Sequence, residues 1–399
     1  MTHITETIKE VINNIIANES ATPIITVEAG SSVGDGFLGV TALVKVELNK
    51  EMSHYFIKMA ATDPQLRKVT LQRDIFEKEI YFYSKLYPIL NKLCLKYIKQ
   101  TFDVVPKPSF TQLDDLKECI VMENLTTENY RVLKDKDTLN KEHLMMILKK
   151  YALLHACGFI LKQEHGGIFN ELLDSKNNLM GQLNTTLGFD TLLVNPSLDL
   201  LKKHCTLEND EEILSNIERI RDKSKNFVNV IENIDEYNTL LHIDCWRNNI
   251  MFKYMGNKLE NIKIIDFQTW SINSPIFDIS ILIYTTSASQ ENLDNIDEYL
   301  NYYHICLNYY LSKMGGNVKE LYPSHVLFEQ WKKYAYYGLF YGIICLRGLF
   351  AGPDSTPNIL QHIRDGKPLN QIFYFEIENE KEYCDRIKIM IKHFIKNKY

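Results

Sequence analysis

Residues 241–249 read Leu-His-Ile-Asp-Cys-Trp-Arg-Asn-Asn, and residues 266–268, after the next apolar run, read Asp-Phe-Gln. Asp244 and Asn249 have the D-x-x-x-x-N spacing of a kinase catalytic loop, and Asp266 stands where a second metal-binding carboxylate is needed. In phosphoryl transfer a carboxylate accepts the proton of the acceptor hydroxyl, and cations neutralise the phosphates. The two motifs therefore predict an ATP-dependent phosphotransferase.

Asn249 and Asp266 are the candidate metal ligands. Mg²⁺ prefers hard oxygen ligands and shares them between protein and phosphates, so one amide oxygen and one carboxylate suffice. Residues 250–254 and 262–265 are short strand candidates, and Gly256-Asn257 between them marks a turn. We expect a hairpin that brings Asp266 back towards Asn249.

Each of these residues also has an ordinary interpretation. A single aspartate after a strand most often forms a turn or caps a helix, and a lone histidine such as His242 is usually a core residue. The ordered set with its spacing favours the kinase interpretation. We expect His242 to orient the loop. Cys245 has no Cys/His constellation around it, so we expect a small buried side chain and not a nucleophile.

A lysine upstream completes the predicted nucleotide site. The strand candidate 55–59 carries Lys58, and a kinase needs such a lysine for the α- and β-phosphates. Apolar residues at helical spacing predict a helix over 71–86, and Glu79 lies within the apolar stripe. Because a carboxylate is costly to bury unless it is paired, we predict a Lys58–Glu79 ion pair. A glutamate on the polar face would instead favour a solvated lysine.

A glycine-rich segment at residues 30–36 precedes the strand candidate 41–48, which is the right order for a phosphate-binding loop. Its spacing does not match the G-x-G-x-x-G loop of protein kinases, and glycine clusters also mark ordinary turns. Gly34 and Gly36 are the candidate phosphate-loop residues, and an ordinary turn remains the alternative.

The order of these segments predicts an α+β, bilobal, protein-kinase-like fold. Residues 1–122 form an N-lobe with an antiparallel sheet and a helix, residues 123–125 form the hinge, and residues 126–399 form a larger, mainly helical C-lobe. The hinge contains Glu123 and Leu125, whose backbone would bind adenine. The catalytic loop and the Asp-Phe-Gln motif belong to the C-lobe.

Composition bounds the partners of the chain. Its 399 residues are 45% hydrophobic and suit two lobes. A net charge of −6 without a basic run argues against nucleic acid or an anionic membrane as the main partner and favours a small molecule. No run reaches the roughly 18 apolar residues of a membrane span. Eight scattered cysteines without C-x-x-C pairs favour reduced thiols and a cytoplasmic location.

Seven stretches run in the order of one known family: Phe56-Ile57-Lys58, residues 76–83, residues 121–125, Leu154-His155-Ala156, residues 242–252, residues 265–268 and residues 274–278. With them the chain resembles the CHK kinase-like, or ecdysteroid kinase-like, family, which is related to choline kinases and aminoglycoside phosphotransferases. Asp-Phe-Gln in place of Asp-Phe-Gly, joined to the loop with Trp246, separates this family from protein kinases.

The resemblance implies ATP and Mg²⁺ as cofactors and a small-molecule hydroxyl acceptor, with ecdysteroids and plant or xenobiotic metabolites among the acceptors. It also implies a role for each matching residue: Asp244 as the catalytic aspartate, Asn249 and Asp266 as metal ligands, Lys58 as the phosphate lysine, Glu79 as its partner, and Asp278 as a structural residue of the C-lobe.

One residue departs from the family pattern. The family usually has glycine between the histidine and the aspartate, where this chain has Ile243. If the family backbone needs a glycine-only conformation there, Ile243 would displace Asp244. A pseudokinase that binds nucleotide or ligand is therefore one alternative, and a choline- or aminoglycoside-type kinase is another.

Acceptor specificity has three candidate segments: residues 169–209, an expected insertion of helices and loops, and the tyrosine-rich stretches 302–310 and 334–341. For the two tyrosine-rich stretches, an aromatic core at helical spacing explains the pattern equally well.

Overall fold

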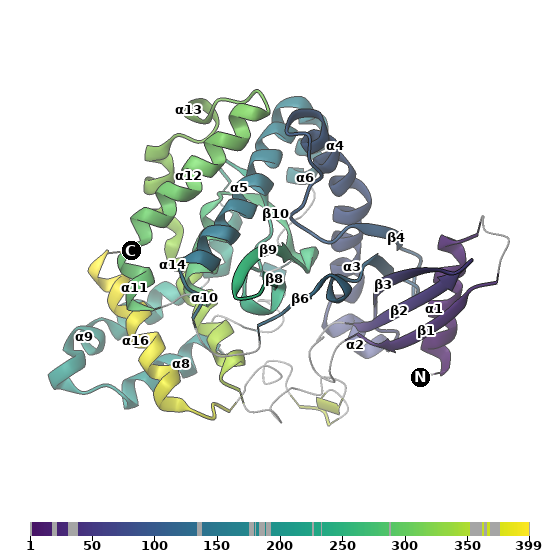
Figure 1. Cartoon of the computed structure of the whole chain (residues 1–399). Coiled ribbons are helices and arrows are strands. Elements are labelled where there is room, and N and C mark those ends of the chain that lie inside the picture. Colours follow the sequence, from purple (N-terminus) through teal and green to yellow (C-terminus); the bar gives the residue numbers. More distant parts are fainter. Residues whose placement is uncertain are drawn as a thin grey trace.

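The computed structural model describes residues 2–17, 22–30, 39–133, 138–174, 179, 181–182, 188, 193–225, 227–232, 234–286, 289–351, 361–362, 365–367 and 376–398. The predicted phosphate-loop glycines Gly34 and Gly36 lie outside these residues. Figure 1 shows a sheet with its helices at one end of the molecule and a larger helical part at the other. The two parts are the predicted N-lobe and C-lobe.

The N-lobe is built on a five-stranded antiparallel sheet in the order β1-β2-β3-β5-β4. Its strands are β1 (Ile24–Ala29), β2 (Val40–Leu48), β3 (Glu51–Met59), β4 (Pro108–Gln112) and β5 (Cys119–Glu123). Successive side chains of a strand face opposite sides of a sheet. Ile57 accordingly packs with helix α1 (Thr2–Ile15), while Lys58 points to the other face.

The helix that carries Glu79 begins one residue later than predicted and runs further. Leu71 has a left-handed backbone (φ 49°), so helix α3 (Gln72–Tyr81) starts after it. One turn of π-helix at Phe82–Leu86 then continues into α4 (Tyr87–Tyr97). Such π-turns inside helices are frequent at functional sites. Here the turn carries Phe82, whose ring stacks on Phe267 of the Asp-Phe-Gln motif at 4.0 Å between centroids.

The C-lobe is mainly helical. Its helices are α5 (Lys141–Glu164), α6 (Gly166–Asp174), α8 (Asn195–Lys203), α9 (Leu207–Ser224), α10 (Ile276–Thr286), α11 (Gln290–Asp294), α12 (Ile296–Lys313), α13 (Val318–Leu321), α14 (Ser324–Leu349) and α16 (Glu380–Lys396). A small sheet is formed by β6 (Tyr130–Arg131), β8 (Ile250–Met255) and β9 (Lys258–Ile264), and β7 (Thr239–Leu241) pairs with β10 (Ser271–Asn273).

Helices α10 and α14 pack with their backbones in close contact. A Cβ on Gly338 of α14 would lie 2.3 Å from the carbonyl oxygen of Ser280 on α10, and one on Gly342 would lie 2.9 Å from the carbonyl oxygen of Tyr284. Two glycines one turn apart therefore allow an approach that any larger residue would prevent. Gly348, near the end of α14, has open space around it.

Helix α5 is the one described helix that is long and apolar enough to cross a membrane by length and composition. In its most apolar window 78% is buried inside the C-lobe. Figure 1 shows it surrounded by other elements of that lobe. Residues 334–346 lie within α14, and most of their side chains are buried.

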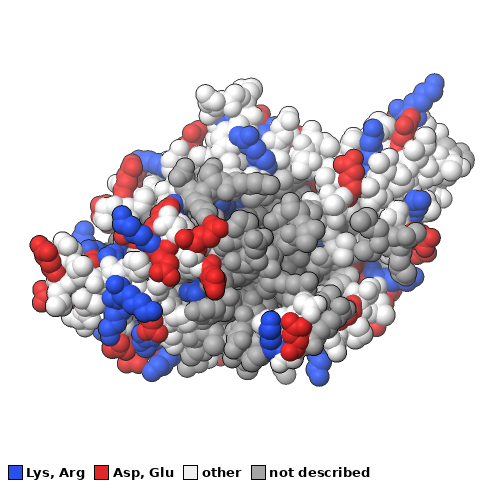
Figure 2. Space-filling view, turned by 90° about the horizontal axis from the view of Figure 1, so that it is seen from below, with Lys and Arg blue, Asp and Glu red and all other residues white. Residues whose placement is uncertain are grey.

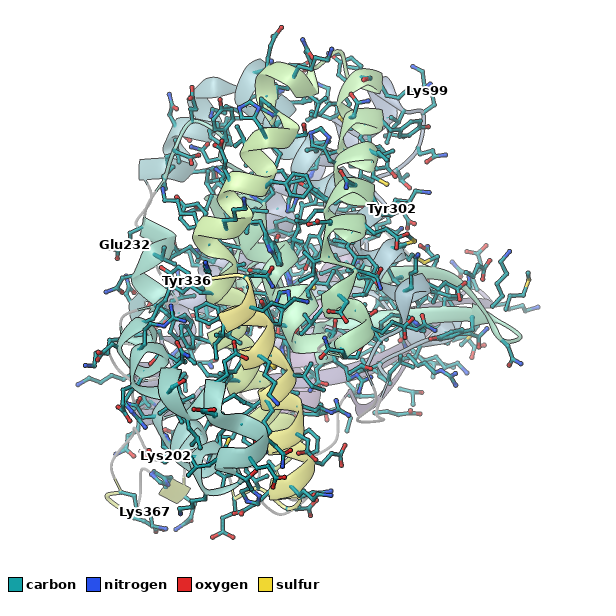
Figure 3. All side chains as sticks on the ribbon, turned by 90° about the vertical axis from the view of Figure 1, so that its left-hand side faces the viewer. Lys99, Lys202, Glu232, Tyr302, Tyr336 and Lys367 are labelled. Atoms are coloured by element: carbon teal, nitrogen blue, oxygen red, sulfur yellow. The ribbon has the colours of Figure 1, made fainter. Side chains whose placement is uncertain are left out.

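On the face seen in Figure 2, lysines and arginines are interspersed with acidic residues. Figure 3 shows Tyr302 and Tyr336 on the outer sides of their helices. Tyr303, Tyr334 and Tyr337 from the same two stretches are instead buried. For these three tyrosines the core interpretation is the right one.

Candidate active site

Lys58 joins the two lobes. Its Nζ donates to Glu79 Oε2 at 2.7 Å and to Asp266 Oδ1 at 2.7 Å. The predicted Lys58–Glu79 pair is therefore present, and Glu79 is 1% exposed. The contact of Lys58 with Asp266 across the lobes was not predicted. It brings the strand lysine and the Asp-Phe-Gln aspartate to one point.

The predicted hairpin is also present. Strands β8 and β9 pair from Ile250↔Ile264 to the turn at Gly256, which has a positive φ of 60°. The Ile265 N–H donates to the Asn249 carbonyl oxygen at 3.0 Å. Because the strands close on each other here, the residues that follow and precede them, Asp266 and Asn249, are held close together.

Asp244 is a largely buried carboxylate, 9% exposed, with both oxygens engaged. Asn249 Nδ2 donates to Oδ2 at 2.8 Å and to the Asp244 main-chain oxygen at 3.0 Å. The hydroxyl of Tyr341, on α14, donates to Oδ1 at 2.7 Å. Since a main-chain oxygen only accepts, the amide nitrogen must face Asp244, and Asn249 Oδ1 remains available as a ligand atom.

The charges of the site are unbalanced. Burial and the nearby Asp266 together raise the pKa of Asp244 to about 8, against the hydrogen bonds from Tyr341 and Asn249, which lower it. Burial would lower the pKa of Lys58, but Asp266 and Glu79 together raise it. Burial also raises the pKa of Glu79. Three carboxyl groups thus lie around one ammonium group, and a divalent cation bound there would favour their charged forms.

The donor set fits Mg²⁺ in its chemistry. Asp266 supplies a carboxylate and Asn249 an amide oxygen, both hard ligands. Among the described residues no group of three or more His, Cys, Asp or Glu side chains could hold a metal by itself. Two protein oxygens are what a site completed by phosphates and water would use. The two residues would hold the ion there.

Asp278, on α10, holds the backbone of the catalytic loop. Its Oδ2 accepts the His242 N–H at 2.8 Å, and its Oδ1 accepts the Ile243 N–H at 2.6 Å. His155 Nε2 lies 3.1 Å from Oδ2. The carboxylate is fully buried and hydrogen-bonded throughout, as burial of a charge requires. The structural role implied for Asp278 is therefore present in the contacts.

His242 connects the loop to the Asp-Phe-Gln motif. Its Nε2 lies 3.0 Å from the Ile265 carbonyl oxygen and 3.1 Å from that of Asp266, so the ring donates to this pair of oxygens. Its Nδ1 lies 3.1 Å from the Tyr151 hydroxyl. Burial lowers the pKa of His242. As predicted, this histidine orients the loop; the fully buried Cys245 beside Asp244 is a filler.

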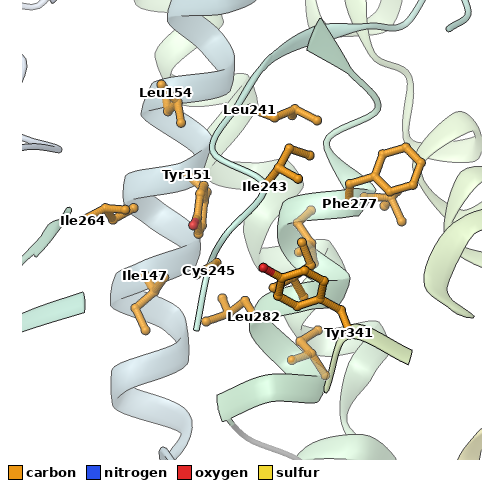
Figure 4. Packing of buried hydrophobic residues seen from close by; sticks show 14 of the residues in the cluster. Ile147, Tyr151, Leu154, Leu241, Ile243, Cys245, Ile264, Phe277, Leu282 and Tyr341 are labelled. Carbon is orange, nitrogen blue, oxygen red and sulfur yellow. The ribbon is translucent and has the colours of Figure 1, made fainter. Parts of the chain in front are cut away.

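Ile243 adopts a left-handed backbone with φ of 66°. Such a conformation favours glycine and is a genuine outlier for a β-branched residue. Ile243 therefore adopts a backbone conformation that glycine favours, and Asp244 next to it is hydrogen-bonded to Asn249. Two contributions offset the strain: the bond from its N–H to Asp278, and complete burial of the side chain. Figure 4 shows Ile243 between α5 and α10.

At the predicted hinge, β5 ends at Glu123 and a short helical turn begins at Leu125. The Glu123 N–H donates to the Lys107 carbonyl oxygen at 3.0 Å, and its carboxylate accepts the Lys107 N–H at 3.0 Å. Leu125 is buried. The adenine-binding role of Glu123 and Leu125, and the domain limits at 123–125, stay predictions.

Tyr341 is the site residue that the sequence did not single out. It was one of several tyrosines in the stretch 334–341. Its neighbours at helical spacing pack into the core. The helical period of the tyrosines alone therefore cannot tell which of them contacts the catalytic loop. One signal was present: Gly338 and Gly342 in the same helix mark the side on which α14 approaches another backbone closely.

Three features define the protein-kinase-like fold: the sheet with its lysine–glutamate pair, the helical lobe, and the catalytic loop that this lobe carries. The sequence profile of the ecdysteroid kinase-like family matches residues 33–316. The chain belongs to that family, and it is thereby placed among small-molecule kinases.

The solved structures to which this chain is similar have low identity to it. An ethanolamine kinase of Plasmodium vivax has a TM-score of 0.34 and 16% identity, over 79% of this chain and 80% of that chain. Spectinomycin phosphotransferase APH(9)-Ia, in complex with ADP and spectinomycin, has a TM-score of 0.42 and 14% identity, over 96% and 98%. None of the curated proteins compared with this chain matches it.

Proposed function

We propose that the protein transfers the γ-phosphoryl group of ATP to a hydroxyl of a lipophilic small molecule, with ecdysteroids and xenobiotic-like alcohols as the acceptor class. One observation carries the proposal. Lys58, Glu79 and Asp266 meet at 2.7 Å contacts from three separate segments, next to Asp244 with its bonded Asn249. A structural core gains little from two buried carboxylates, Glu79 and Asp244, beside a partly exposed third, Asp266, because burying charge is costly.

Each residue has a defined task in this reaction. The acceptor oxygen forms a bond to the γ-phosphorus while the bond to the bridging oxygen of ADP breaks, and Asp244 takes the acceptor proton. Lys58 neutralises the α- and β-phosphates, and Glu79 keeps Lys58 in place. Mg²⁺, held by Asn249 and Asp266, would supply positive charge against the phosphate oxygens. Positioning and charge neutralisation account for most of the rate in this chemistry.

The test is transfer of labelled phosphate from Mg-ATP to a panel of ecdysteroids, phenolic compounds, choline and aminoglycosides. Asp244→Ala should abolish transfer. Asn249→Ala should also abolish it, whereas Asn248→Ala, which changes the exposed neighbour of the same type, should leave it intact. Transfer by Asp244→Ala at the wild-type rate would refute the catalytic role of this aspartate. Labelling of choline or aminoglycosides alone would replace the acceptor class proposed here.

A pseudokinase is the alternative that the Ile243 substitution raised. The left-handed backbone of Ile243 speaks against it, since the residue leaves Asp244 bonded to Asn249. A nucleotide-binding protein without activity would still be stabilised by Mg-ATP, by about 2.7 kcal/mol at a hundred times the dissociation constant. Stabilisation without transfer to any acceptor would therefore favour the pseudokinase.

We also propose a cytosolic location. All eight cysteines are free thiols, and five of them are buried. Reduced thiols are typical of proteins that stay in a reducing compartment. Fluorescence microscopy of the tagged full chain in its own cells tests this proposal directly.

A further inference from the structure

Tyr341 is hydrogen-bonded to a carboxylate oxygen of Asp244, the proposed catalytic base. Its hydroxyl donates to Asp244 Oδ1 at 2.7 Å, and Asn249 Nδ2 donates to Oδ2 at 2.8 Å. Both oxygens of the proposed base therefore have a protein donor. An acceptor hydroxyl must reach one of these two oxygens, because it gives its proton to this carboxylate.

The two donors differ in how firmly they are held. Asn249 donates twice, to the carboxylate and to the main-chain oxygen of Asp244, and it lies in the turn that leads into the hairpin. Tyr341 donates only one hydrogen bond, from the hydroxyl at the end of its long side chain. Oδ1 is therefore the oxygen that an acceptor reaches. The Tyr341 hydroxyl that donates to Oδ1 is the same kind of hydrogen-bond donor as the hydroxyl of an acceptor molecule.

The contact between Tyr341 and Asp244 is built into the packing of the C-lobe. Helix α14 is fixed on α10 through Gly338 and Gly342, next to Tyr341 in the chain. Helix α10 also holds the catalytic loop through Asp278. One helix thus sets the positions of both partners. In Figure 4 the hydroxyl end of Tyr341 points towards the segment that carries Cys245.

We propose that the Tyr341 hydroxyl occupies the place of the acceptor hydroxyl on Asp244 until an acceptor arrives, and thereby keeps water from using this base. The inference rests on the proposed function. In the reaction that Tyr341 suppresses, a water oxygen bonds to the γ-phosphorus of ATP while the bond from that phosphorus to the bridging oxygen breaks. ADP leaves with the electron pair of that bond, and Asp244 takes the water proton. Tyr341 therefore favours organic hydroxyls over water.

The burial of both side chains supports this role. Tyr341 is 8% exposed and Asp244 is 9% exposed, so little solvent reaches their contact. A carboxylate in such a site still needs donors, since an unbonded buried charge is costly. Without the Tyr341 hydroxyl, water is the donor that would take its place on Oδ1.

The decisive measurement is ADP release from Mg-ATP without any acceptor, by the wild type and by Tyr341→Phe. Loss of a hydrogen bond to a charged group opens Oδ1, so we expect hydrolysis to rise about tenfold in Tyr341→Phe. Transfer to 20-hydroxyecdysone should not rise with it, so the ratio of hydrolysis to transfer increases. A purely structural role of Tyr341 would lower both reactions together.

The matched control is Tyr337→Phe, one turn earlier on the same helix. The Tyr337 hydroxyl is buried and has no hydrogen-bond partner among the described residues. We expect its removal to leave the ratio of hydrolysis to transfer unchanged. If Tyr341→Phe does not fold, Tyr341→Met removes the hydroxyl with a flexible side chain and decides the question in the same assay.

The outcomes separate the two proposals. A rise in hydrolysis confined to the Tyr341 variant supports the inference that Tyr341 keeps water from Asp244. If the wild type labels no acceptor of the panel, it is the proposed acceptor class that fails. Hydrolysis by the Tyr341 variant that does not exceed the wild type overturns the inference, including the case in which neither protein hydrolyses ATP. An equal rise in Tyr337→Phe overturns it as well.

Discussion

The energetic cost of the left-handed backbone at Ile243 can be measured with a pair of substitutions, Ile243→Ala and Ile243→Gly. Both remove a side chain that is fully buried among residues of α5 and α10. Replacing a buried isoleucine by alanine costs about 2–5 kcal/mol, mostly as lost burial and a cavity. We therefore expect both variants to be less stable than the wild type, although glycine is the residue that the backbone itself favours.

The difference in stability between the two variants reports the steric penalty of the backbone conformation alone. At φ of 66° alanine keeps the steric penalty and glycine loses it, so we expect the glycine variant to be more stable by about 1 kcal/mol. In ordinary backbone the order is reversed, and glycine is less stable than alanine by about 0.5–1 kcal/mol. The two expectations therefore differ in sign.

Urea unfolding followed by tryptophan fluorescence is the suitable assay. The three tryptophans, Trp246, Trp270 and Trp331, all lie in the C-lobe with residue 243, so the signal reports the right part of the chain. Midpoints are compared at equal m-value. Ile264→Ala and Ile264→Gly, at a buried strand position without positive φ, form the control pair and should show the ordinary order. An alanine variant at 243 that is more stable than the glycine variant would refute the reasoning.

Three further predictions concern other parts of the chain. Glu79→Gln should lower phosphoryl transfer at least about tenfold, because it removes one of the two anionic partners of the phosphate lysine. Glu77→Gln, on the exposed face of the same helix, should leave transfer unchanged. Equal transfer rates of the two variants would contradict the pairing role of Glu79. Gly338→Ala should lower the free energy of unfolding by about 1–3 kcal/mol or more through overpacking, whereas Gly348→Ala should leave it equal or higher, as thermal melting will show. Burial lowers the pKa of His393 to about 4, so between pH 6.5 and pH 4 the unfolded chain binds the extra proton. Stability is then full above about pH 6.5 and falls by up to about 3 kcal/mol towards pH 4, and His393→Gln should remove this part of the pH dependence.

Local patterns predicted the elements of the site well. The strand with Lys58, the helix with Glu79 and the hairpin from Asn249 to Asp266 all follow from side-chain period and turn residues. The ion pair followed from one rule, that a buried carboxylate needs a partner. The ends of the elements were less certain. Leu71, with its left-handed backbone, and the π-turn at Phe82–Leu86 have no signal in the period of apolar residues.

The contacts across the lobes could not be predicted in the same way. Lys58 and Asp266 are 208 residues apart in the chain, and Tyr341 and Asp244 are 97 apart. Nothing in a local window relates such residues, because their distance depends on how whole helices and strands pack. The backbone of residue 243 is a similar case, since the side chain alone suggests an ordinary φ.

The sequence by itself determined the residue types of the site and the segments that carry them, because side-chain period and turn preference act over a few residues. Only the tertiary structure decided that Lys58 also meets Asp266, that Tyr341 closes on Asp244, and that Ile243 takes a glycine-like conformation. The reason is physical. The Lys58–Asp266 contact depends on how the two lobes pack. The other two features depend on the approach of α14 to α10 and on Asp278, and at Ile243 packing and buried hydrogen bonds outweigh local backbone preference.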